Sequence, residues 1–338
     1  MQQHMRVLAG DIGGTKTSLA IYSFGEGTEG GAANGHPRVL RAARYPSASA
    51  PGLEPLVRRF LGEGPPEDLA ASAFAVAGPV VDGRSRTTNL PWELDASELG
   101  ARLGHPVALL NDFHGIALGV TDLGDDDVER LQVGERDAAA PVAVIGAGTG
   151  LGEAMLLPTS TGPRVLASEG GHADFAPRDA LEIDLLRFLL ARHQRVSYER
   201  VLSGRGLAAL HDFVVAQGLA HELPTTRERL GREDPGAVVG ELGVRGEDPA
   251  CARAVDLFAA IYGAEAGNLA LKALPFGGLF IAGGVALHLR PRLREGFMPA
   301  FLAKGRMSPL LARVPVSIVL DPEVGRRGAA LAAVALLR

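Results

Sequence analysis

The chain contains a single cysteine, Cys251, among its 338 residues. One cysteine can form no disulfide within the chain and cannot build a cysteine zinc cluster. Long hydrophobic runs are also missing: the longest, from Ala329 to Leu337, is about half of the ~20 residues that a membrane span requires. The opening segment MQQHMRVLAGD has no apolar stretch of signal-peptide length, so we expect no signal peptide and a reducing, cytoplasmic location.

Neither sign of charge prevails. The chain has 34 Lys and Arg against 39 Asp and Glu, a formal net charge of −5 and a pI near 6.0. This balance argues against non-specific binding to nucleic acid or to anionic membranes. Aromatic residues are only 5% of the chain while hydrophobic residues are 46%, so the cores have to be built from aliphatic side chains. The length suffices for two domains.

Glycine is abundant, with 44 residues, and two glycine-rich segments follow one pattern. VLAGDIGGTKTSLAIY (7–22) and VIGAGTGLGEAMLL (144–157) each read as an apolar strand, a Gly/Thr turn and a second strand. Strands mixed with helical segments along the chain indicate the α/β class. We therefore expect a duplicated α/β domain with a cleft between the two copies.

Other segments have recognisable secondary-structure patterns. Helical spacing predicts helices at 53–62, at roughly 250–274 and at 328–337, and Asp179 with Glu182 fits a capping box. Apolar runs predict strands at 107–110, 277–282 and 315–320. The insert at 25–36 is expected to be a surface loop, and the charged, glycine-punctuated stretch 227–248 gives no clear element.

The two Gly/Thr turns are candidate phosphate-binding loops, because successive backbone N–H groups in such turns form a concavity for anions. Hairpin turns also use glycine for positive φ, so a purely structural role is the alternative. GDIGGTKT lacks the glycine that a P-loop has before its lysine, here Lys16, and GAGTGLG fits the dinucleotide motif in no frame. A phosphate-gripping β-hairpin remains.

Polar side chains stand where two strands end. Asp11 directly precedes the first turn and would suit a Mg²⁺ bound largely through water, or it could simply form the turn. Asn111 and Asp112 end the strand in PVALLNDFHG (106–115), at the carboxyl edge where open α/β sheets hold ligands. Asn and Asp also favour turns at strand ends, so the residues alone leave both explanations open.

Seven motifs together resemble bacterial glucokinases of the enterobacterial type, in this order: GDIGGTKT, TNLPW, LLNDF, GAGTGLG, SEGGHADFAP, YERVLSG and FIAGGV. The resemblance covers about residues 6–335. It implies two actin-like (ribonuclease H-like) domains of duplicated origin with an interdomain cleft. It also implies ATP and Mg²⁺ as cofactors, glucose as the substrate phosphorylated at its 6-hydroxyl, and a homodimer, with no nucleic-acid or membrane partner.

The resemblance implies roles for individual residues. Asp112 would be the catalytic base. The sugar ligands would be Asn111, Asp112, Glu169, His172 and Glu199. The nucleotide-binding residues would be Asp11, Gly13, Gly14, Thr15, Gly148, Thr149, Gly150, Gly283 and Gly284, with Asp11 holding Mg²⁺ through water.

Lys16 and Glu153 depart from what relatives often carry at these positions. We expect a small domain over 1–122 plus 318–338 with the first hairpin. A large domain over 123–317 would hold the second hairpin and the adenosine turn. The alternatives to a glucokinase are a kinase for another hexose (mannose, fructose or an N-acetylhexosamine) and a non-catalytic sugar sensor.

Overall fold

The computed structural model describes residues 5–25, 37–64, 68–87 and 90–338. The glycine-rich insert at 26–36 lies outside the described residues, so its expected loop stays a prediction. Contacts divide the chain into two units, one of Met1–Asp127, Leu156–Ala167 and Asp321–Arg338, the other of Val128–Met155 and Ser168–Leu320. The domain limits and the cleft expected from the sequence stay predictions. Within the described residues no helix is both long and apolar enough to cross a membrane.

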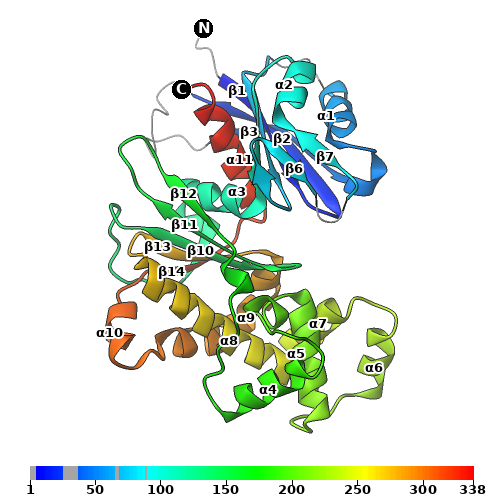
Figure 1. Ribbon diagram of the computed structural model, residues 1–338, viewed down its shortest axis with the longest axis vertical. Coiled ribbons are helices and arrows are strands. Elements are labelled where there is room, and N and C mark those ends of the chain that lie inside the picture. Colours follow the sequence, from blue (N-terminus) through cyan, green and yellow to red (C-terminus); the bar gives the residue numbers. More distant parts are fainter. Residues whose placement is uncertain (1–4, 26–36, 65–67, 88–89) are drawn as a thin grey trace. The chain divides into compact units, whose positions relative to one another are not determined.

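The first unit is built on a five-stranded sheet of order β3-β2-β1-β4-β8 (Figure 1). Its strands are β1 (Met5–Ile12), β2 (Lys16–Phe24), β3 (Arg38–Pro46), β4 (Ala71–Val76) and β8 (Val107–Asn111). The first three pair antiparallel, whereas β4 is parallel to both β1 and β8. The carboxyl ends of β1, β4 and β8 therefore share one edge of the sheet.

Alternation along β1 gives this sheet two buried faces. Leu8 and Ile12 pack with the first pair of helices, and Val7 and Ala9 belong to a separate core lined by the alanines of the last helix. The helices on the first face are α1 (Leu53–Gly62) and α2 (Ala96–Leu103), and those of the second are α3 (Asp112–Gly119) and α11 (Val324–Ala335). A small sheet of β5 (Val80–Val81), β6 (Arg84–Arg86) and β7 (Glu93–Asp95) completes the unit.

The second unit repeats this arrangement. Its sheet has the order β12-β11-β10-β13-β14-β9, in which β10, β13 and β14 are parallel and β9 is antiparallel to β14. The end of β11 and most of β12, within Leu156–Ala167, are counted in the first unit. The strands are β9 (Val128–Gln132), β10 (Val142–Ala147), β11 (Leu151–Leu157), β12 (Arg164–Ser168), β13 (Gly278–Ala282) and β14 (Val316–Val319). The five strands from β12 to β14 correspond in order to β3 to β8 of the first unit, so the internal duplication and the α/β class expected from the sequence are confirmed.

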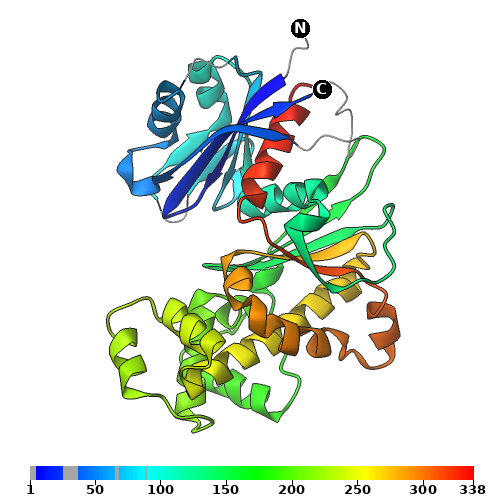
Figure 2. The same cartoon turned by 180° about the vertical axis from the view of Figure 1, so that it is seen from behind.

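The described residues of the second unit form seven α-helices, which are seen below the sheet in Figure 1 and from behind in Figure 2. They are α4 (Ala180–Leu190), α5 (Gly204–Ala216), α6 (Pro224–Leu230), α7 (Pro235–Arg245), α8 (Pro249–Ala273), α9 (Gly284–Leu302) and α10 (Ser308–Leu311). The long α8 packs against α5, α7 and α9. Phe258, Tyr262 and Phe297 form a chain of edge-to-face ring contacts in this core.

Most of the predicted elements are confirmed, with differences at their ends. The closing helix α11 begins at Val324 rather than at Gly328. The stretch 227–248, for which no clear element was predicted, holds most of α6 and all of α7. Helix α7 starts at Asp234–Pro235, and the aspartate side chain caps Ala237 N–H. Asp179 caps α4 as predicted, but Glu182 accepts from the N–H of Arg178 instead of closing a reciprocal box.

Glycines let α3 and α11 approach backbone to backbone. A Cβ added at Gly328 would lie 1.8 Å from the Gly115 oxygen, and one at Gly119 would lie 2.0 Å from the Val324 oxygen. No side chain fits at such distances, because the obstructing atoms are backbone and cannot rotate away. This close packing fixes α11 against the edge at which β1 and β8 end.

Gly328→Ala is therefore expected to destabilise the first unit by about 2–3 kcal/mol, since the two helices must separate to admit the methyl group. Urea unfolding followed by circular dichroism measures the loss. Gly62→Ala is the matched control, because nothing lies within 4 Å of the added Cβ at that helical glycine. Equal effects of the two substitutions would contradict the packing argument.

Candidate functional site

The first glycine turn joins β1 to β2 and is held by its own backbone and by Ser47. Gly13 N–H donates to the Lys16 oxygen at 2.9 Å, and the Ser47 hydroxyl donates to the Gly13 oxygen at 2.8 Å. Neither Gly13 nor Gly14 is among the described glycines with positive φ. The alternative explanation of the glycines, a hairpin that needs positive φ, therefore does not apply here, and an accessible backbone remains as the reason for them.

Asn111 and Asp112 stand at the junction of β8 and α3. The Asn111 side chain accepts from the Phe113 N–H at 2.9 Å and donates to the Gly78 oxygen at 3.1 Å, so it caps α3. This is the turn-forming role that the sequence left open, and it is compatible with a second lone pair on the amide oxygen binding a ligand. Asp112 is the first residue of the helix and half-buried.

Two carboxyl groups meet at the carboxyl edge of this sheet. Burial and, after it, the negative charges of Asp112 and Glu323 together raise the pKa of Asp11 to about 6, against the opposing charge of Arg326. The strands β1 and β8 that deliver Asp11 and Asp112 are separated by β4 and by a hundred residues of sequence. A cluster of carboxylate oxygens of this kind is the donor set that Mg²⁺ prefers.

Residues at the start of α11 complete the surroundings of Asp11, and sequence reasoning missed them. Glu323 accepts from the Ser18 hydroxyl at 2.6 Å and pairs with Arg326 at 2.8 Å, and Arg326 is buried. A Cβ added at Gly325 would lie 3.5 Å from Asp11 Oδ2. The only signal in the sequence was the acidic, glycine-containing run DPEVGRR (321–327), which has no motif-like spacing.

The second glycine turn and the predicted adenosine turn are neighbours in the second unit. They follow β10 and β13, which pair in parallel with Gly146 opposite Ala282. Gly283 has φ +93°, and a Cβ there would lie 2.5 Å from the Ala147 oxygen, so only glycine fits. Gly148 and Gly284 have open space around the position of an added Cβ.

The remaining predicted sugar ligands gather around the start of β11. A Cβ added at Gly171 would lie 2.0 Å from the Leu151 oxygen, so the loop that carries Glu169 and His172 rests directly on this strand. Glu169 and His172 are exposed, and their Oε2 and Nε2 atoms are 3.9 Å apart. Glu199 accepts from the Leu151 N–H at 3.2 Å, which holds its carboxylate over the second glycine turn.

Asp174 does not orient the His172 ring. Its Oδ1 accepts from Arg195 at 2.9 Å, and the same Arg195 nitrogen donates to the His172 backbone oxygen at 2.7 Å. The exposed pair therefore braces the backbone of the loop rather than the imidazole.

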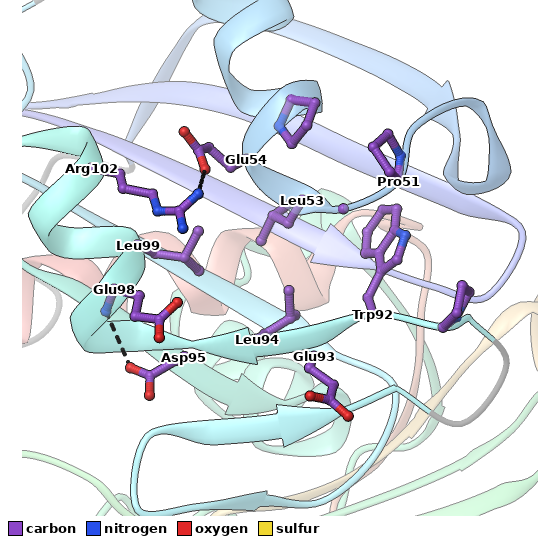
Figure 3. Close-up of a pocket in the computed structure, with 13 residues that line it drawn as sticks. Pro51, Leu53, Glu54, Trp92, Glu93, Leu94, Asp95, Glu98, Leu99 and Arg102 are labelled. Atoms are coloured by element: carbon purple, nitrogen blue, oxygen red, sulfur yellow. Dashed lines mark hydrogen bonds and ion pairs between the residues drawn. The ribbon is translucent and has the colours of Figure 1, made fainter.

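The structure thus distributes the predicted residues over the two units. The first unit holds Asp11, Gly13, Gly14, Thr15, Asn111 and Asp112. The second holds Gly148, Thr149, Gly150, Glu169, His172, Glu199, Gly283 and Gly284. A surface pocket of the first unit, lined by Trp92, Glu54 and Arg102 among others, contains none of them (Figure 3).

Glu153 is buried directly beneath the Glu169–His172 loop, a role that the sequence did not indicate. A Cβ added at Gly170 would lie 2.0 Å from Glu153 Oε2. Burial and, after it, the neighbouring Glu265 together raise the pKa of Glu153 to about 8, against the opposing charge of Lys272. Burial likewise raises the pKa of Glu265. One proton shared by the two carboxyl groups therefore removes a repulsion that the buried site could not otherwise tolerate.

This carboxyl pair is connected to the rest of the second unit by hydrogen bonds. Asn268 donates to Glu265 at 2.8 Å and to the Tyr198 hydroxyl at 3.0 Å. The Lys304 ammonium donates to the Ala264 oxygen at 2.9 Å and also to the Asn268 side chain. Because Tyr198 precedes Glu199, the network links α8 to both segments that carry the predicted sugar ligands.

A proton retained on Glu153 makes stability depend on pH. The folded pKa lies above the unfolded value of 4.5, so the folded state binds more protons between about 4.5 and about 8, and the free energy of unfolding falls as pH rises through that window. Glu153→Gln replaces the protonated carboxyl with an amide and is expected to flatten this fall by on the order of 2 kcal/mol. Urea titrations at about pH 5.5 and about pH 9 measure it.

The exposed Glu228→Gln removes a carboxylate with no comparable burial and serves as the control. Its pH dependence is expected to match that of the unaltered chain. A Glu153→Gln chain with the same pH dependence as the control would show that Glu153 is already ionised in the folded state.

Comparison with known proteins places these features in one family. A glucokinase family model matches residues 8–336. The glucokinase of Nostoc sp. strain PCC 7120 is 44% identical over 346 residues, covering 98% of this chain and 99% of that protein. The glucokinase of Synechocystis sp. strain PCC 6803 is 42% identical, covering 96% of this chain and 97% of that protein.

A solved structure agrees with these sequence relatives. The crystal structure of glucokinase from an Antarctic psychrotroph superposes with a TM-score of 0.84 at 32% identity, covering 98% of this chain and 100% of that one. The sugar-kinase type of α/β fold expected from the sequence is confirmed. The two units match each other, and in each the central strand ends in a glycine turn. Because its relatives match it along nearly the whole length, the chain belongs to the glucokinase family.

Proposed function

We propose that this chain transfers the γ-phosphoryl group of ATP to the 6-hydroxyl of glucose, giving glucose 6-phosphate and ADP. The observation that carries the proposal is the match to glucokinases over residues 8–336, together with relatives of that name at up to 44% identity. The carboxylate pair at the end of β1 and β8 gives this assignment a chemical basis, because phosphoryl transfer to a hydroxyl needs an acceptor for the hydroxyl proton and compensation for phosphate charge.

Asp112 is the proposed general base. As the 6-hydroxyl oxygen bonds to the γ-phosphorus, Asp112 takes the hydroxyl proton and the bond to the ADP oxygen breaks. Its position supports this role, since the Asn111 cap and the end of strand β8 restrict the carboxylate to the carboxyl edge of the sheet. Asp11 beside it stays the less suitable base, because it lies where Mg²⁺ would compete for its oxygens.

The proposed sugar ligands are Asn111, Asp112, Glu169, His172 and Glu199. A hexose offers a ring of hydroxyls that each donate and accept, and carboxylates, an amide and an imidazole can satisfy them in pairs. Glu169 and His172 are supported by their exposure and by their 3.9 Å separation, which suits adjacent hydroxyls of one small ring.

The proposed nucleotide ligands are Gly13, Gly14 and Thr15 of the first turn, Gly148, Thr149 and Gly150 of the second, and Gly283 with Gly284. Asp11 would hold Mg²⁺ through water, and the half-buried, oxygen-rich surroundings of its carboxylate fit that ion. When bound, the ion would neutralise phosphate charge. Homodimer formation is a further part of the proposal.

A kinase for another hexose is the nearest competing function, and a sugar sensor without catalysis is the next. With Mg-ATP, we expect sugar 6-phosphate formation to be at least about 100-fold more efficient for glucose than for mannose, fructose or N-acetylglucosamine, because each epimer or substituent mismatches a buried polar contact. A coupled assay of kcat/KM over the four sugars measures this. A preference for another sugar would move the substrate, and binding of glucose without turnover would favour the sensor.

Asp112→Asn is expected to lower kcat by about 10²–10⁴-fold with a smaller change in KM for glucose, because the amide can still bind a hydroxyl but cannot accept its proton. Asp126→Asn, at an exposed position of the same unit, is the control and should retain full activity. Asp112→Asn protein with near-normal kcat would rule out the base assignment while leaving the reaction intact.

A further inference from the structure

Four side chains that can ligate a metal converge inside the second unit, and none of them is a predicted site residue. His211 lies on α5, Glu222 follows that helix, and Asp248 and Cys251 stand at the start of α8. One ligand atom each from His211, Asp248 and Cys251 lies within 4.8 Å of the other two, and all three residues are buried. Glu222 Oε1 is 3.7 Å from His211 Nε2.

His211 has an unmet hydrogen-bonding atom in this cluster. Its Nε2 is fully buried without a hydrogen-bond partner among the described residues, and only 3% of the His211 side chain is exposed. An isolated imidazole nitrogen in such surroundings costs free energy, since it has lost its water and gained nothing in exchange. A cation bound by Nε2 would supply the missing partner.

The other three groups have partners that leave ligand capacity facing His211. Glu222 is 8% exposed and pairs with Arg227 at 2.6 Å through Oε2, which leaves Oε1 directed at the imidazole. Asp248 caps α8 by accepting from Cys251 N–H at 2.8 Å, and its other oxygen accepts from Leu223 N–H at 2.8 Å. The same Oδ2 also accepts from the Thr226 hydroxyl at 2.7 Å, so the lone pair of Asp248 that remains for a cation is on Oδ1.

The charges around Cys251 also call for a cation. Burial raises the pKa of its thiol, and the negative charges of Asp248 and Glu222 raise it further, with Arg229 opposing. The Asp248 and Glu222 carboxylates thus adjoin the Cys251 thiol and the His211 ring inside the second unit. A divalent ion would offset both carboxylates and displace the thiol proton to solvent.

We infer that His211, Asp248 and Cys251, with Glu222 as the fourth ligand, form a structural zinc site that ties α5 to the start of α8. The nitrogen, sulfur and oxygen set suits Zn²⁺, which binds such ligands tetrahedrally at about 2.0–2.3 Å. Ligand atoms in that geometry lie roughly 3.3–3.8 Å apart, so those of His211, Asp248 and Cys251, which lie within 4.8 Å of one another, need to approach by up to about 1.5 Å. The inference is independent of the proposed sugar phosphorylation.

The site would stabilise the frame behind the second glycine turn. Gly204 at the start of α5 donates its N–H to the Gly148 oxygen at 2.9 Å, and α8 carries the Glu265 of the buried carboxyl pair. A metal clamp between these two helices would therefore hold both elements at their working separation.

The test uses the full-length protein stripped with a chelator and then titrated with Co²⁺ and Zn²⁺. We expect one equivalent of Co²⁺ with a thiolate-to-cobalt charge-transfer band, displacement of that band by one equivalent of Zn²⁺, and a higher unfolding temperature with zinc. Cys251→Ser, which conserves size, should abolish the band. His211→Ala should weaken binding by at least about 10-fold.

His193→Ala, at a half-buried histidine that follows α4, is the matched control and should bind as the unaltered chain does. Circular dichroism of each stripped protein checks that it is folded. Stripped, folded protein of natural sequence that gives no saturable thiolate band would overturn the inference, whatever the variants do. Equal metal loss in the His193→Ala control would also overturn it, because binding would then be adventitious.

Discussion

The structure depends on how polar groups leave a buried sheet at the carboxyl ends of its parallel strands. In each unit the central strand, β1 or β10, is covered on its flanks by neighbouring strands and is largely buried. Polar groups that could bind a ligand become accessible only where this strand ends, and there a glycine turn exposes backbone N–H groups. Parallel strands of the same sheet, β8 in one unit and β13 in the other, then deliver Asp112 and Gly283 to the same kind of edge.

Close backbone approach is the means by which these edges are organised. Gly171 rests on the Leu151 oxygen, Gly283 on the Ala147 oxygen and Gly328 on the Gly115 oxygen, at distances that any side chain would violate. Backbone atoms cannot be repacked as side chains can, so each contact fixes a loop or helix within a narrow range. The segments that carry the predicted ligands are thereby positioned by neighbours that have no chemical role themselves.

Burial of acids has different consequences in the two units. Asp11 is raised in pKa by burial and by Asp112, yet Arg326 opposes and keeps an anion within reach at neutral pH. Glu153 and Glu265 have each other as neighbours, and a shared proton is the cheaper state for them. The ionisable Asp11 suits a group that binds a cation next to phosphate. The protonated Glu153–Glu265 pair suits a structural role beneath the Glu169–His172 loop.

The sequence by itself determined the class of fold, the duplication and the family. Hydrophobic periodicity and Gly/Thr turns are local properties, and ordered motifs such as GDIGGTKT and SEGGHADFAP can be recognised in the sequence without any knowledge of the fold. No element was predicted at α7, although the Asp234–Pro235 start signal was present in the sequence. It was silent on Glu323 and Glu153, because nothing in a residue's own neighbourhood says which strand or helix will cover it.

Only the tertiary structure decided which of these residues act on one another. The meeting of Asp11 with Asp112 requires β4 to lie between β1 and β8, and the burial of Glu153 requires α8 and the Glu169–His172 loop to close over β11. The cluster of His211, Asp248 and Cys251 likewise exists only because α5 packs against α8. Electrostatic coupling and burial depend on distance in space, which separation along the chain does not fix.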